Sequence, residues 1–245
     1  MPRAETFFDV SAFVYGHRGL WGVAGPENSL AAFEAAKSHG IGVELDVRLT
    51  ADGVPIVFHD ASLERMCRDG RTLNQVSAED LRGVRLPDGS HVPALRDVLD
   101  VMQDLPVLLE LKVDVPGDAA IADVVAHALS DRDGLFAVMS FDEVTVARLC
   151  RLVEDRPVGL LIDSEGRIGA DAVAAKAGKA RAMGCDYLAP HLSSLGGASR
   201  HSGGLPLATW TLRAPSDLEL AKKYAAAPIF EGFGPSLVTG LAKLS

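Results

Sequence analysis

Short apolar runs alternate with alanine-rich helical stretches along this chain, and this alternation limits the possible folds more than any other feature. The runs that read as strands are Phe13–Gly16, Gly42–Val47, Val54–His59, Val107–Leu111, Leu135–Met139, Val158–Ile162, Tyr187–Ala189, Leu205–Trp210 and Ala227–Glu231. The helical patterns between them are Ser29–Ser38, Leu95–Met102, Ala119–Ser130, Glu143–Val153, Ala170–Met183 and Ser216–Tyr224. Strands that alternate with helices predict a parallel sheet covered by helices, and therefore an α/β fold.

Such a sheet is either an open doubly wound sheet or a closed barrel. The length of 245 residues is close to the roughly 250 residues typical of one (β/α)₈ barrel. No linker or low-complexity tract divides the chain, so we expect a single-domain (β/α)8 TIM barrel over residues 1–245. Nine strand candidates exceed eight, so one run must lie outside the barrel or not be a strand. The link from Asp46 to His59 has no room for a helix, and the stretch 61–93 leaves space for a small insertion at most.

Composition excludes several classes of protein. Mean hydropathy is +0.16, and no apolar run approaches the roughly 20 residues needed to span a membrane. Residues 1–10 carry charges without a long apolar stretch, which argues against a secretory signal. Cys67, Cys150 and Cys185 form no CxxC pair, so we expect neither a zinc site nor disulfides, and we expect a cytoplasmic location. The net charge of −9 argues against nucleic acid as a partner, and an anionic substrate must be met by local positive charge.

Polar residues gather where strand candidates end. The set is His17, Arg18, Glu44, Asp46, His59, Glu110 and Lys112. Residues two apart on a strand share a face, so Glu44 lies beside Asp46, and Glu110 beside Lys112. If these faces point into a barrel, the charges converge at its carboxyl-terminal mouth, where barrel active sites lie. Each residue alone has an ordinary structural explanation, and it is the repetition on four strands that indicates a functional site. The other histidines lack this pattern and are expected to be structural or solvated: His39, His91, His127, His191 and His201.

The motifs, taken in order, resemble the glycerophosphodiester phosphodiesterase family. They are His17-Arg18-Gly19, Pro26-Glu27-Asn28-Ser29, Glu44-Leu45-Asp46-Val47, Val57-Phe58-His59-Asp60 and Glu110-Leu111-Lys112, supported by Thr50-Ala51-Asp52-Gly53, Leu63, Arg65, Pro93-Ala94-Leu95, Ser140-Phe141 and Trp210-Thr211. The resemblance implies a (β/α)₈ barrel that binds one divalent cation and hydrolyses glycerophosphodiesters to sn-glycerol 3-phosphate and an alcohol. It also implies acid–base roles for His17 and His59, and metal ligands at Glu44, Asp46 and Glu110. Arg18 and Lys112 match the residues that hold the phosphate.

The chemistry of these residues agrees with the resemblance. Three carboxylates without a thiol make a hard-oxygen site suited to Mg²⁺ or Ca²⁺. Three carboxylates, a dication and two cationic side chains leave one positive charge, which matches the single negative charge of a phosphodiester. Asn28 or Ser29 is expected to cap the following helix, with Glu27 as a brace for the metal site. Trp210 is a candidate for the floor of the glycerol pocket, and the alternative is a place in the core.

The sequence departs from the family near its end. Family members usually show a Gly-Ile-x-Thr-Asp-x-Pro type of segment, whereas this chain has Gly232-Phe233 in place of the Thr-Asp pair, with Glu231 nearby. The departure affects substrate detail more than chemistry. Two alternatives remain open: a lysophospholipase D type of hydrolase on the same site, and a non-catalytic barrel that binds phosphodiesters. A barrel glycosidase would not call for Arg18 and Lys112 beside the acids.

Overall fold

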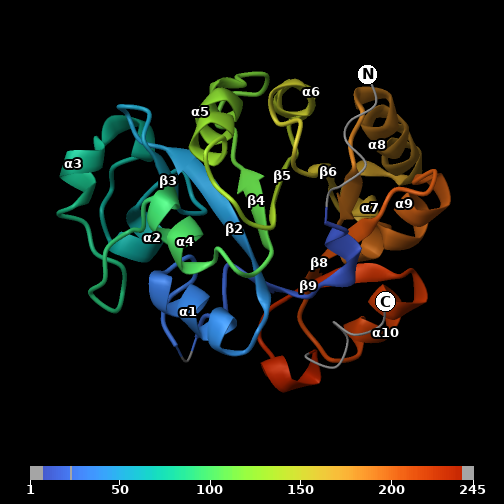
Figure 1. Ribbon diagram of the computed structural model, residues 1–245, viewed down its shortest axis with the longest axis horizontal. Coiled ribbons are helices and arrows are strands. Elements are labelled where there is room, and N and C mark those ends of the chain that lie inside the picture. The colour runs from blue at the N-terminus through green and yellow to red at the C-terminus, as the bar shows by residue number, and fades with distance from the viewer. Residues whose placement is uncertain (1–7, 23, 239–245) are drawn as a thin grey trace.

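The computed structural model of the chain describes residues 8–22 and 24–238, and within them a ring of parallel strands closes into a barrel (Figure 1). Its strands are β1 (Tyr15–His17), β2 (Gly42–Leu49), β4 (Val107–Leu111), β5 (Phe136–Ser140), β6 (Val158–Ile162), β7 (Tyr187–Pro190), β8 (Leu207–Leu212) and β9 (Ala226–Phe230). The ring closes because β1 pairs in parallel with both β2 and β9. The expected (β/α)₈ barrel is therefore confirmed. Residues 1–7, part of the N-terminal segment considered above, lie outside the described range.

One predicted strand lies outside the barrel, as the count of candidates required. Strand β3 (Pro55–Val57) pairs antiparallel with β2, with Val47 opposite Val57. The expected strand Val54–His59 is shorter in the structure, and His59 lies two residues beyond its end. A parallel neighbour needs a crossover long enough for a helix, and the link is too short, so the chain turns back as a hairpin. Gly53 sits in that turn with a φ of 78°.

Helices cover the outside of the barrel. The predicted helices are present as α1 (Leu30–Ser38), α4 (Leu95–Val101), α5 (Ala120–Leu129), α6 (Glu143–Leu152), α8 (Ala170–Met183) and α10 (Asp217–Lys223). Four more described helices were not predicted: two lie in the insertion described below, and the other two are α7 (Glu165–Ile168) and α9 (Leu195–His201). Adjacent glycines at 196 and 197 give α9 weak helix propensity, and the burial of Leu195 and Ala198 stabilises it. Among the described residues, no helix is both long and apolar enough to cross a membrane.

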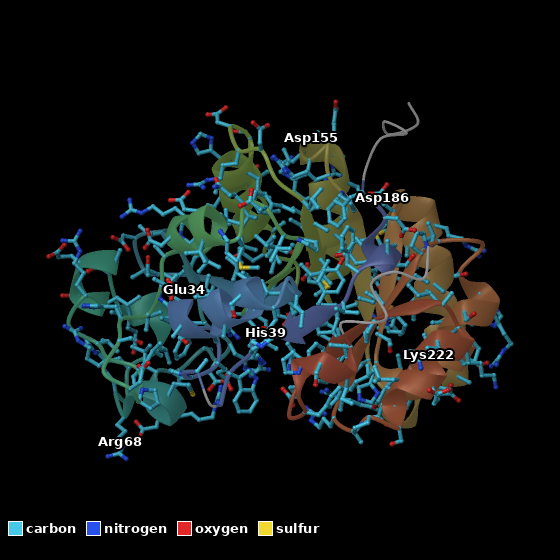
Figure 2. The ribbon with its side chains drawn as sticks, turned by 60° about the horizontal axis from the view of Figure 1, so that its bottom comes forward. Glu34, His39, Arg68, Asp155, Asp186 and Lys222 are labelled. Atoms are coloured by element: carbon cyan, nitrogen blue, oxygen red, sulfur yellow. The ribbon has the colours of Figure 1, made fainter. Side chains whose placement is uncertain are left out.

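A small insertion follows β3 and stands apart at the left of Figure 1. It contains α2 (Glu64–Cys67) and α3 (Ala78–Leu81), and Arg68 marks its edge in Figure 2. Its apolar side chains, among them Leu63, Leu73 and Leu81, form a cluster of their own. Short 3-10 turns complete the described chain at Val10–Ala12, Leu73–Gln75, Leu192–Ser194 and Pro235–Leu237.

The strands present different residues to the helices and to the barrel interior. On β2, Val43, Leu45 and Val47 pack with the buried helix residues. The intervening positions therefore face inward, where Tyr187 and other apolar residues from several strands form a separate cluster. Gly159 makes room for the Tyr187 ring, since a Cβ at position 159 would lie 2.4 Å from a ring carbon. Below the mouth the barrel is thus a packed core, and its polar residues are confined to the carboxyl ends of the strands.

Candidate functional site

Three carboxylates lie together at the mouth of the barrel. Glu44 and Asp46 share the inner face of β2, and Glu110 lies opposite Asp46 on β4. Their exposed fractions are 2%, 0% and 7%, and one oxygen from each lies within 4.8 Å of the others. Isolated buried carboxylates are unfavourable unless cations or a metal compensate them. The cluster therefore requires positive charge at its centre.

Two cationic side chains supply part of that charge. Lys112 Nζ lies 3.0 Å from Asp46 Oδ1 and 2.6 Å from Glu110 Oε1. Arg18 Nε lies 3.2 Å from Asp46 Oδ2. Three carboxylates against two cations leave the group short by one positive charge. Asp46 Oδ1 is buried and accepts no hydrogen bond of good geometry despite its ion pair. An acceptor left in this state fits a site with capacity for a further cation.

The charges in the cluster shift one another's pKa values. Burial, with Asp46 and Glu110 nearby, raises the pKa of Glu44 well above its ordinary value. Burial also opposes ionisation of Asp46, but Lys112 and Arg18 outweigh it and hold the pKa of Asp46 well below its usual range. The pKa values of Glu44 and Asp46 are therefore shifted in opposite directions although the two residues share one strand face. Within the cluster, the ionised form of Glu44 is therefore disfavoured and that of Asp46 is favoured.

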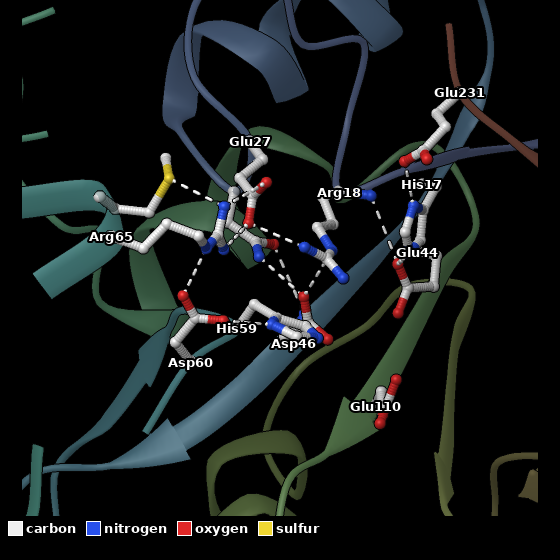
Figure 3. A network of polar contacts seen from close by, with 12 residues as sticks. His17, Arg18, Glu27, Glu44, Asp46, His59, Asp60, Arg65, Glu110 and Glu231 are labelled. Atoms are coloured by element: carbon white, nitrogen blue, oxygen red, sulfur yellow. Dashed lines mark hydrogen bonds and ion pairs between the residues drawn. The ribbon is translucent and has the colours of Figure 1, made fainter. Parts of the chain in front are cut away.

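Two histidines flank the carboxylates, and a carboxylate holds each through Nδ1 (Figure 3). His17 Nδ1 lies 2.5 Å from Glu231 Oε2, and its Nε2 lies 3.9 Å from Glu44 Oε2. His59 Nδ1 lies 2.6 Å from Asp60 Oδ1. Burial lowers the pKa of His59, and Asp46 partly opposes the shift. His59 reaches the mouth because the hairpin brings β3 back along β2, where the Phe58 amide donates to the Asp46 carbonyl.

The Glu27-Asn28-Ser29 segment braces the cluster. Ser29 caps α1 by accepting a hydrogen bond from the Ala32 amide, so the capping prediction holds for Ser29. Asn28 instead donates from Nδ2 to Asp46 Oδ2 at 2.8 Å. Glu27 accepts from Arg18 Nη1 at 2.8 Å and from Arg65 Nη2 at 2.6 Å.

Arg65 ties the insertion to the same network. Its Nε donates to Asp60 Oδ2 at 2.5 Å, while its terminal nitrogens donate to Glu27. Arg65 thus connects Asp60, which holds His59, to Glu27, which holds Arg18. The insertion thereby fixes side chains on both sides of the site (Figure 3).

A pocket of about 470 Å³ opens above the cluster. Apolar side chains contribute to its lining: Met139, Phe141, Leu161, Trp210 and Ile229. Polar side chains outside the cluster also line it: Asp163, Ser164, Arg167, His191, Thr211 and Arg213. A substrate in the pocket therefore meets both charged groups and apolar side chains.

The structure brings all seven residues singled out from the sequence to one site. Trp210 lies in the pocket wall, edge-on to Phe141 at a centroid distance of 5.5 Å, and its Nε1 donates to the Ala189 carbonyl. His191, expected to be structural or solvated, lines the same pocket and packs against Trp210.

The contacts of Asn28 and Glu231 and the polar residues at 163, 164, 167, 191, 211 and 213 that line the pocket were not predicted from the sequence. The departure noted at 231–233 was the one signal that pointed to Glu231. The polar lining residues share no repeated motif.

Comparisons with known proteins agree with this arrangement. A probable glycerophosphodiester phosphodiesterase 1 of Mycobacterium tuberculosis is 31% identical over 188 residues, which cover 66% of this chain and 68% of the relative. A probable glycerophosphodiester phosphodiesterase 2 from the same species is 33% identical over 112 residues, which span 45% of this chain and 42% of that relative.

Solved structures share the fold over nearly the whole chain. A glycerophosphodiester phosphodiesterase from Parabacteroides distasonis superposes with a TM-score of 0.77 at 22% identity, covering 94% of this chain and 96% of the other. An Oleispira antarctica phosphodiesterase in complex with the product sn-glycerol-3-phosphate has a TM-score of 0.79 at 20% identity, covering 95% and 97%. The family model for glycerophosphoryl diester phosphodiesterases matches residues 17–232 of this sequence. Since that match spans most of the 245 residues and includes every element of the site, the chain belongs to that family.

Proposed function

We propose that this protein hydrolyses glycerophosphodiesters to sn-glycerol 3-phosphate and an alcohol with the help of one divalent cation. The observation that carries the proposal is the group of three buried carboxylates, two cations and two carboxylate-held histidines at the mouth of one barrel. The product named for the Oleispira structure is the product expected here. A non-catalytic binder would have no use for two histidines held in this way.

Glu44, Asp46 and Glu110 would hold the cation. Their oxygen donors suit Mg²⁺ or Ca²⁺, and the deficit of one positive charge and the unsatisfied Asp46 Oδ1 both favour a bound dication. When bound, the ion supplies Lewis-acid polarisation of a phosphoryl oxygen. Arg18 and Lys112 line the pocket and are placed to bind the phosphodiester anion.

The two histidines would share the proton transfers. In our hypothesis His17 removes the proton from the glycerol 2-hydroxyl, whose oxygen forms a bond to phosphorus. The bond from phosphorus to the alcohol oxygen breaks, and His59 protonates that oxygen. The resulting cyclic phosphate is then opened by water, with the protons moved in the reverse sense. Acid and base catalysis of this kind typically contribute about 10²- to 10⁴-fold each.

The shape of the pocket favours small polar substrates. Trp210 and Phe141 offer an apolar wall for the glycerol carbons. The lining also includes the charged residues Asp163, Arg167 and Arg213, which would leave an acyl chain in contact with charged groups. We therefore favour water-soluble glycerophosphodiesters over the lysophospholipids of the alternative hypothesis.

The test is the release of glycerol 3-phosphate from a panel of glycerophosphodiesters and lysophospholipids, with EDTA and with re-added Mg²⁺ or Ca²⁺. We expect activity on the soluble diesters that disappears with EDTA and returns with the ion. Activity that survives complete chelation would contradict the metal assignment, and a preference for lysophospholipids would contradict the substrate assignment.

The roles of the histidines are tested separately by pH–rate profiles. The wild-type profile should be bell-shaped. His17→Ala should lose the acidic limb, and His59→Ala the alkaline limb. A fully active His17→Ala enzyme would end the hypothesis.

A further inference from the structure

Glu231 lies immediately after the last barrel strand, within the segment where this chain departs from the usual family pattern. Its amide donates to the Leu212 carbonyl at 3.0 Å, which ties the residue to the end of β8. Its side chain is only 13% exposed. A carboxylate buried to this extent needs partners for both of its oxygens.

Each oxygen of Glu231 has one partner. Oε2 lies 2.5 Å from His17 Nδ1, and Oε1 lies 2.8 Å from Arg213 Nε. Arg213 is 63% exposed, whereas His17 is 12% exposed. The carboxylate therefore connects a solvated cation to a nearly buried imidazole, and Figure 3 shows it behind His17, on the far side of the ring from Glu44.

We propose that Glu231 is a positioning residue for His17, which fixes the proton on Nδ1 and turns the free lone pair of Nε2 into the pocket. An ionised carboxylate only accepts hydrogen bonds, so the imidazole nitrogen facing it must carry the hydrogen. The other nitrogen is then left as the acceptor, and it faces the carboxylate cluster. This inference rests on the proposed function, because it presupposes that His17 acts as the base.

His59 is also held by a carboxylate at Nδ1, but that carboxylate comes from its neighbour in the sequence. Asp60 contacts His59 Nδ1 and is itself paired with Arg65, as Glu231 is paired with Arg213. Asp60 directly follows His59 in the chain, whereas Glu231 is 214 positions from His17. Each histidine thus has a carboxylate and an arginine behind it. This parallel favours a positioning role for Glu231 over a surface ion pair with Arg213 alone.

The kinetic test uses the metal-loaded enzyme with glycerophosphocholine as substrate. Glu231→Gln keeps the size of the side chain, but its amide donates as well as accepts and no longer enforces one tautomer. Loss of an orienting partner of this kind typically costs about 10- to 100-fold. We expect kcat to fall by about that factor while KM changes less than about threefold. Glu231→Asp should recover part of the loss because it keeps the charge.

Glu143→Gln is the matched control. Glu143 is 31% exposed, is paired with Lys176 and Lys179, and is not among the residues that line the pocket. Its substitution should leave both kcat and KM unchanged. A Glu231→Gln enzyme with wild-type kcat, or with a raised KM and unchanged kcat, would overturn the positioning role.

The tautomer of His17 is measured independently of activity by long-range ¹H–¹⁵N NMR, with the His17 signals assigned by their loss in His17→Asn. We expect hydrogen on Nδ1 in the wild-type protein and a mixture of tautomers in Glu231→Gln. Hydrogen on Nε2 in the wild-type protein would overturn the inference. If the wild-type enzyme releases no glycerol 3-phosphate from any diester, the proposed function fails, and the NMR result still decides whether Glu231 orients His17.

Discussion

Replacing Glu44 by Gln should stabilise the metal-free protein while abolishing its response to metal. Glu44 is 2% exposed, and Asp46 and Glu110 both disfavour its ionised form. A neutral amide of the same size removes this strain. Its carbonyl oxygen can still accept the 3.3 Å hydrogen bond from the Arg18 amide.

The magnitude follows from charge separation and linkage. Two unit charges within 4.8 Å of each other repel by at least about 3.5 kcal/mol at an effective dielectric constant of about 20. Protonation limits the cost, because keeping a carboxyl with an ordinary pKa of 4.5 neutral at pH 7 takes about 3.4 kcal/mol. Since the folded pKa is raised, this cost is absent well below pH 4.5 and grows as pH rises. Arg18 and Lys112 offset part of it, so we expect a gain of about 1–3 kcal/mol, or about 2–10 °C in Tm.

The assay is thermal unfolding at pH 7 in EDTA and with Mg²⁺ or Ca²⁺ in excess. An ion at about 100 times its Kd stabilises the wild-type protein by about 2.7 kcal/mol, and the variant should gain little. The advantage of the variant in EDTA should therefore shrink or reverse when metal is added. Glu143→Gln, outside the site, should respond to metal as the wild-type protein does. A Glu44→Gln protein that is less stable than wild type in EDTA, or that gains as much from metal, would refute the reasoning.

Two further predictions concern stability in EDTA, measured by urea unfolding. Burial opposes ionisation of Glu27, but the hydrogen bonds from Arg65 and Arg18 hold its pKa below the ordinary 4.5. The ionised Glu27 side chain therefore stabilises the folded protein above pH 4.5, and this stabilisation is lost as pH falls through the folded pKa. Glu27→Gln should cost about 1.5–3 kcal/mol at pH 7 and progressively less below pH 4.5; an equal cost at pH 3 would contradict this. Gly159→Ala should cost about 1–3 kcal/mol by overpacking, because its Cβ would meet the Tyr187 ring, whereas Gly166→Ala, with open space at its Cβ, should cost much less.

Local periodicity was enough to predict most of the barrel. Apolar runs and helical spacing depend on residues close in sequence, and the face shared by Glu44 and Asp46 follows from strand geometry alone. The reversal at Gly53 was harder to predict, because the sequence from 54 to 59 looks like any buried strand. The length of the link gave the warning, but it did not show that β3 would pair antiparallel with β2.

Contacts between residues that are distant in the sequence could not be predicted from periodicity. Asn28 and Ser29 were both candidates for the helix cap, because polar residues before a helix usually cap it. The structure shows that Ser29 is the cap, whereas the side chain of Asn28 holds Asp46. The difference depends on where β2 lies relative to the loop after β1, which only the folded chain determines.

Closure of the barrel explains why the end of the sequence matters to a site that begins at residue 17. In an open sheet the first and last strands can lie at opposite edges, and a carboxylate after the last strand would have no access to His17. In the closed ring β9 pairs with β1, so the residue that follows β9 must lie beside the residue that ends β1. Closure of the barrel therefore places Glu231 beside His17, a contact that was not predicted from the sequence. A substitution in this segment changes the surroundings of the proposed base directly, and the departure at 231–233 bears on the chemistry as well as on substrate choice.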